Sequence, residues 1–115
     1  MDTQTFYKTV GGDYNEIMAR LMTEERVLRF VRKFPADGSY ALLKQSLSGG
    51  NQEEAFRAAH TLKGVAQNLG FNALYEKAAA VTEILRGGSM EVAALMPAVD
   101  EAYKTVIDAI PQIDG

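Results

Sequence analysis

Glycine residues divide this chain into segments that are each short enough for a single helix. All ten glycines except Gly64 lie where a helical segment should end, and apolar residues between them recur every three or four positions. No segment has the sustained alternation of apolar and polar residues that a half-buried strand needs, and the connections are short. The pattern therefore predicts an all-α fold.

Polar residues that can cap a helix mark where several of these segments begin. Glu16 and Glu54 each follow a capping residue by three positions, which makes two capping boxes. The expected capping residues are Asp13, Thr23, Ser39 and Asn51. Apolar side chains at helical spacing are expected to fill the core, among them Val27, Phe30, Val31, Phe34, Met18, Met22, Met90 and Met96.

Two long helices are expected to pack as an antiparallel hairpin. The first covers 52–69, and the second covers 72–86 with apolar residues at coiled-coil spacing. A last helical stretch begins at Ser89, and Pro97 marks either its first turn or a kink. We expect one domain over 1–115, an antiparallel up-down four-helix bundle with short N-terminal helices as a cover.

The rarest residue types limit the chemistry that is available. The chain contains no cysteine and one histidine, His60. The missing thiols exclude cysteine nucleophiles, disulfides, iron–sulfur clusters and cysteine-based zinc sites, and one histidine is too few for a histidine-rich metal site or a di-iron bundle. We expect no metal site, and any imidazole chemistry must use His60.

The charge balance bears on the class of partner. Twelve Lys and Arg against fifteen Asp and Glu give a net charge of −3, which offers no basic surface for nucleic acid. No segment has the length of apolar sequence that a membrane span requires, and the start resembles no signal peptide. A free-standing cytoplasmic monomer is expected.

Gly64 lies in the middle of the predicted helix over 52–69, where a glycine costs about 1 kcal/mol relative to alanine. At about 100° per residue, the apolar residues of this helix gather on one side. His60, Lys63, Gly64 and Gln67 lie on the opposite side. The glycine is therefore predicted to face outward beside the only histidine, where it leaves room for an external body.

The neighbours of His60 admit more than one interpretation. Lys63, one turn on, would attract an anion carried by the imidazole, although Lys63 or Gln67 alone would be read as a solvated side chain. Phe56, one turn before His60, projects about 40° from it. It is either a half-buried aromatic under the N-terminal cover helix or an anchor for a docking partner.

A specific family resemblance starts at the histidine. The run His60-Thr61-Leu62-Lys63-Gly64, continued through Ala66 and Leu69 to Gly70, resembles the H-x-x-K-G signature of histidine phosphotransfer (HPt) domains. Core positions of that family are also matched, at Phe30, Phe34, Leu74 and Ala78. The resemblance thus extends over essentially the whole chain.

The resemblance implies that the chain relays phosphate. In HPt domains the histidine accepts a phosphoryl group on Nε2 from the aspartyl phosphate of a response-regulator receiver domain, and passes it to another receiver. His60 would be the acceptor, Lys63 the phosphate stabiliser and Gly64 the gap that admits the receiver. The remaining site residues would be Gln67 and Phe56 for receiver docking, and Thr82, where other members carry Gln or Glu, for orienting the ring.

The implied partners are receiver domains and a hybrid histidine kinase. Mg²⁺ would come from the receiver, so the chain itself needs no cofactor. It contains neither of the glycine-rich phosphate-binding motifs, G-x-x-x-x-G-K-[ST] and G-x-G-x-x-G, so ATP binding and autokinase activity are not expected. The alternative is a non-phosphorylated helical adaptor that docks a signalling partner without phosphotransfer.

Overall fold

The structure, a computed structural model, describes residues 1–114, and in that range it contains helices and their connections without a strand. This confirms the all-α class. Its α-helices are, in order, α1 (Thr3–Thr9), α2 (Tyr14–Leu21), α3 (Glu24–Val31), α4 (Ser39–Ser48), α5 (Gln52–Asn68), α6 (Asn72–Arg86) and α7 (Met96–Ala109). Two short 3₁₀ helices lie at Phe34–Ala36 and Ile110–Gln112.

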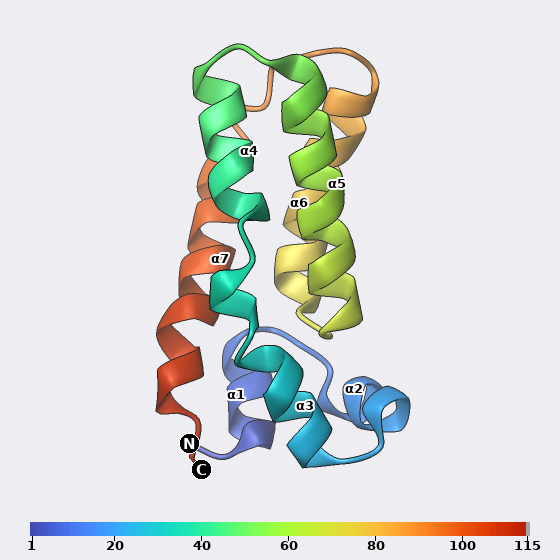
Figure 1. Ribbon diagram of the computed structural model, residues 1–115, viewed down its shortest axis with the longest axis vertical. Helices are drawn as coiled ribbons and strands as arrows, with labels where there is room; N and C mark the ends of the chain where they lie inside the picture. The colour runs from blue at the N-terminus through green and yellow to red at the C-terminus, as the bar shows by residue number, and fades with distance from the viewer. Residues whose placement is uncertain (115) are drawn as a thin grey trace.

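Helices α4 to α7 lie side by side along the long axis of a body that measures 41 × 23 × 21 Å (Figure 1). Tight turns join α4 to α5 and α5 to α6, so these neighbours run in opposite directions. Helices α1, α2 and α3 gather at one end, near the turn between α5 and α6. None of the helices in residues 1–114 has the length and apolarity needed to cross a membrane.

Three of the four predicted caps are confirmed. The side chains of Asp13, Thr23 and Asn51 each accept a hydrogen bond from the backbone amide three residues later, at 3.0 to 3.2 Å. The prediction for Ser39 is wrong, because Ser39 is already the first helical residue of α4. The carboxylate of Asp37 accepts from the Ser39 amide at 2.9 Å instead, from just upstream of the helix.

The start predicted for the last helix is also wrong, since α7 begins at Met96 and not at Ser89. Gly87 caps the end of α6, and Gly88 follows it with a φ of 91°, a conformation that favours glycine. The hydroxyl of Ser89 then accepts from the amide of Glu91 at 3.0 Å, which forms a local turn in place of a helical turn. Pro97 lies in the first turn of α7, which was one of the two positions predicted for it.

Small side chains allow α5 to approach its neighbours closely. The inner face of α5 and the facing residues of α6 are at most 2% exposed: Ala55, Ala58, Ala59, Leu62, Ala66, Leu74, Ala78, Val81 and Leu85. Two expected core residues are exposed instead, Phe30 by 45% and Met22 by 68%. Val27 and Val31 occupy the buried side of α3, and Met22 is the C-cap residue that follows α2, with a φ of 76°.

An aromatic cluster attaches the N-terminal helices to the end of α5. Helix α1, which the sequence analysis did not identify, buries Phe6 and Tyr7 beside Phe71, with ring centroids 5.9 and 6.0 Å away from that ring. The Tyr7 hydroxyl donates to the carbonyl of Leu69 at 2.7 Å. This fixes the C-terminal end of α5 against α1.

A polar clamp joins α4 to α7. The carboxylate of Asp100 accepts from the Tyr40 hydroxyl at 2.6 Å and from the Lys44 ammonium at 3.0 Å. The rings of Tyr40 and Tyr103 stack with centroids 3.8 Å apart. Partial burial alone would raise the pKa of Asp100, but the hydrogen bonds from Tyr40 and Lys44 outweigh it and hold that pKa below its ordinary value.

We predict that Asp100→Asn lowers the free energy of unfolding by about 1 kcal/mol at pH 7, a figure discounted for the partial exposure of the side chain. A depressed folded-state pKa means that the stabilisation is present above the unfolded pKa of about 4 and is lost as the pH falls through the folded value. Urea denaturation at pH 7 and pH 3 should therefore show the gap between wild type and variant closing at the lower pH.

The matched control is Asp108→Asn, which removes a carboxylate from an exposed pair with Lys104 on the same helix. It should change stability by less than about 0.5 kcal/mol. If Asp100→Asn lowers the free energy of unfolding as much at pH 3 as at pH 7, the stabilisation does not come from the ionised carboxylate of Asp100.

Candidate functional site

Helix α5 has one buried face and one that points into solvent. Ala59 and Leu62 are buried on the first face, and His60 between them is exposed. This follows from the helical period, because residues next to each other in sequence project in different directions. The outward direction predicted for His60 is confirmed.

Gly64 faces open space one turn beyond His60. A Cβ built on Gly64 meets no atom within 4 Å, in contrast to Gly12, where a Cβ would lie 2.4 Å from the carbonyl oxygen of Gly70. Internal packing therefore explains the glycine at position 12 but not the one at position 64. The predicted vacancy beside the histidine is present.

We predict that Gly64→Ala stabilises the protein by about 0.5 to 1 kcal/mol, because alanine favours the helix and its methyl group clashes with nothing. Gly12→Ala, the control, should destabilise by more than about 1 kcal/mol through its clash with Gly70. Urea denaturation of both variants tests this. A loss of stability in Gly64→Ala would show that the position is sterically closed.

Lys63 is half-buried and lies one turn from His60. Its ammonium forms no ion pair within residues 1–114. By contrast, the guanidinium of Arg57 is already paired with Glu53 at 3.0 Å and Glu54 at 3.1 Å. The charge of Lys63 is therefore available to an anion bound at the histidine.

Phe56 lies against the imidazole. The two rings are stacked with centroids 6.0 Å apart and planes inclined by 23°. The guanidinium carbon of Arg86, the last residue of α6, lies 5.1 Å from the centroid of the Phe56 ring. Phe56 is half-buried. The N-terminal helices do not cover it, as the first of its two interpretations required, because they contact the opposite end of α5 through Arg20 and the carbonyl of Asn68.

Thr82 forms no hydrogen bond with the histidine within residues 1–114. It is fully buried, and its hydroxyl donates to the carbonyl of Ala78 at 2.7 Å within α6. In the part of the chain that the structure describes, the hydrogen bond expected from Thr82 to the His60 ring is therefore not formed. Arg86, which the sequence analysis did not single out, reaches the site instead through Phe56.

Gln67 is exposed on the last turn of α5, and its side chain forms no hydrogen bond within residues 1–114. Its backbone carbonyl accepts from Arg20 of α2 at 3.1 Å. Residues 1–114 also hold no group of three or more histidine, aspartate or glutamate side chains arranged to bind a metal ion.

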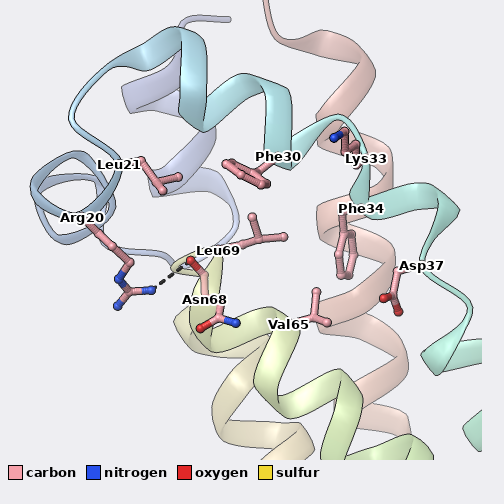
Figure 2. A pocket seen from close by; sticks show the side chains of 9 residues that line it. All are labelled: Arg20, Leu21, Phe30, Lys33, Phe34, Asp37, Val65, Asn68 and Leu69. Carbon is pink, nitrogen blue, oxygen red and sulfur yellow. Dashed lines mark hydrogen bonds between the residues drawn. The ribbon is translucent and has the colours of Figure 1, made fainter.

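A groove of about 410 Å³ opens where α2 and α3 meet the C-terminal end of α5 (Figure 2). Phe30 and Phe34 reach it from one side, and Val65 and Leu69 from the other. Two cations flank the apolar lining. Arg20 donates to the Asn68 carbonyl at 2.9 Å, and the Lys33 ammonium lies 5.8 Å from the centroid of the Phe30 ring. The exposed Phe30 belongs to this groove.

Comparison with known families agrees with this geometry. The family model for the Hpt domain matches residues 36–112, which include α4 to α7 and the histidine motif. Searches of curated proteins and of solved structures found no match. The chain therefore belongs to the Hpt domain family.

Membership of this family connects the chain to phosphorelay signalling, in which Hpt domains carry phosphate without binding ATP and interact with response regulators and kinases. The match begins at Ala36, so α1, α2 and α3 lie outside it. The family pattern thus covers less of the chain than the whole-length resemblance predicted.

Proposed function

We propose that this Hpt domain carries a phosphoryl group between the aspartates of receiver domains, with His60 as the phosphoacceptor. The observation that supports this most is the exposed imidazole of His60 with empty space at Gly64. In the proposal, α4 to α7 act as an up-down four-helix bundle whose rigid packing holds that imidazole toward the partner.

The proposed transfer is a displacement at phosphorus. The lone pair on Nε2 of the neutral ring forms the new N–P bond while Nδ1 carries the proton. The O–P bond of the receiver's aspartyl phosphate breaks, and its electron pair leaves with the carboxylate. Such reactions are accelerated mainly by positioning and charge neutralisation, so the receiver's Mg²⁺ and the Lys63 ammonium supply what the chemistry needs.

The other residues of the outward face contact the partner in this proposal. Gly64 leaves the gap through which the receiver's acidic pocket reaches the imidazole, and Gln67 and the exposed edge of Phe56 touch the receiver around it. The proposed partners are response-regulator receivers and a hybrid histidine kinase upstream, and the proposed working form is a cytoplasmic monomer.

One observation favours the alternative, an adaptor that docks a signalling partner without transfer. The groove between α3 and α5 presents apolar surface, including Phe30, beyond what the transfer of phosphate at His60 requires. An adaptor would bind through that surface and leave His60 unmodified.

We predict that a receiver domain phosphorylated with radiolabelled acetyl phosphate transfers label to the wild type and that the transferred label is labile in acid. His60→Gln should carry no label, because glutamine removes the nucleophile and keeps a polar side chain of similar size. Circular dichroism of the variant checks that the helices are retained. Binding of the receiver without label on the wild type would instead establish the adaptor.

We also predict that Gly64→Gln slows transfer by about ten- to a hundredfold, since a long side chain displaces the receiver from the imidazole and small misplacements have effects of this size. Rates are measured by quenching the transfer reaction at a series of times. Gly64→Ala serves as the graded control, with a smaller effect than glutamine. Wild-type rates in a well-folded Gly64→Gln protein would remove this explanation of the glycine.

A further inference from the structure

No hydrogen bond within residues 1–114 orients the imidazole of His60. Thr82, the residue expected to do so, uses its hydroxyl inside α6. The ring contact that the structure provides is the stack on Phe56, at 6.0 Å and 23°. That geometry falls within the range of offset-stacked aromatic pairs.

The direction in which helical side chains project places Phe56 where it can restrict the orientation of the His60 imidazole. Side chains on a helix lean toward its N-terminus, over the residue one turn earlier, and residues four apart have Cβ atoms about 5 to 6 Å apart. The imidazole of His60 therefore leans over Phe56. Phe56 is half-buried, so its ring is more constrained than the exposed imidazole above it.

Arg86 in turn holds the ring of Phe56. Its guanidinium carbon lies 5.1 Å from the ring centroid, within the range of a cation–π contact. Its Nε also donates to the carboxylate of Glu83, one turn earlier on α6, at 3.3 Å. The contacts thus run from α6 through Arg86 and Phe56 to the imidazole on α5.

We propose that Phe56 is the positioning residue of His60: its ring, held by Arg86, keeps the imidazole in the orientation from which it accepts phosphate. This rests on the proposed function and extends it, because it assigns the orienting role to an aromatic stack in place of a hydrogen bond. Phe56 acts on the rate of transfer through His60, whereas a docking anchor acts on the affinity for the receiver.

The first test needs no phosphate. Nuclear magnetic resonance of the full chain should show cross-relaxation between the ring protons of Phe56 and His60. Phe56→Leu should shift the His60 ring-proton resonances toward those of free histidine, and Phe56→Tyr should keep them near wild type. Ring-proton resonances that are the same in wild type and Phe56→Leu would overturn the proposal.

The second test measures single-turnover transfer from a phosphorylated receiver at a series of receiver concentrations. Phe56→Leu should lower the saturating rate constant by about two- to tenfold, the factor that an aromatic pair corresponds to. A rise in the half-saturating concentration beside that loss would report the contact of the Phe56 edge with the receiver. Phe56→Tyr should restore the rate. An unchanged saturating rate with a higher half-saturating concentration would make Phe56 a docking anchor and overturn its positioning role.

Arg86→Gln tests the stack without changing Phe56 itself. It should lower the saturating rate constant by about two- to fivefold, as expected for a cation–π contact at an exposed site. The matched control is Arg29→Gln, which removes an exposed arginine that is paired with Glu25 on α3, away from the site. Equal effects of Arg86→Gln and Arg29→Gln would contradict the specific role of Arg86.

The outcomes separate this inference from the proposed function. If the wild type takes label and Phe56→Leu keeps the wild-type saturating rate, positioning by Phe56 is wrong and the relay proposal stands. If the wild type takes no label from any receiver, the relay proposal fails. The resonance measurements then still decide whether Phe56 orients the imidazole.

Discussion

The close packing of α5 against α4 and α6 is the constraint on which the rest of the structure depends. Ala55, Ala58, Ala59 and Ala66 allow the backbones to approach, and Leu62 is fully buried on the same face. Because one face of α5 is buried in this way, the positions between must face solvent. His60 and Gly64 are on that exposed face for this reason, with no local bend or loop required.

The surroundings of the histidine divide into a rigid part and an open part. On the side toward α6, Phe56 and Arg86 form a continuous stack against the imidazole. On the other side, Gly64 leaves open space and Lys63 keeps an unpaired charge within residues 1–114. This arrangement supports the proposed transfer, in which the imidazole is held from one side and the receiver approaches from the other.

Regularities along one helix could be predicted from the sequence, and contacts between helices could not. The bounds of α6, the caps at Asp13 and Asn51 and the outward face of α5 all follow from spacing and capping rules. The contact between Arg86 and Phe56 depends on how the ends of α5 and α6 meet, and the exposure of Phe30 depends on a groove between α3 and α5. No periodicity carries that information.

The central claim is that His60 takes the phosphoryl group on Nε2, and the most direct measurement locates the phosphorus atom. In a phosphorylated sample, phosphorus–proton correlation by nuclear magnetic resonance should connect one ³¹P signal to both carbon-bound ring protons of His60, since Nε2 neighbours both of those carbons. Coupling to a single ring proton, which indicates Nδ1, or a phosphorus signal on any other residue would contradict the account.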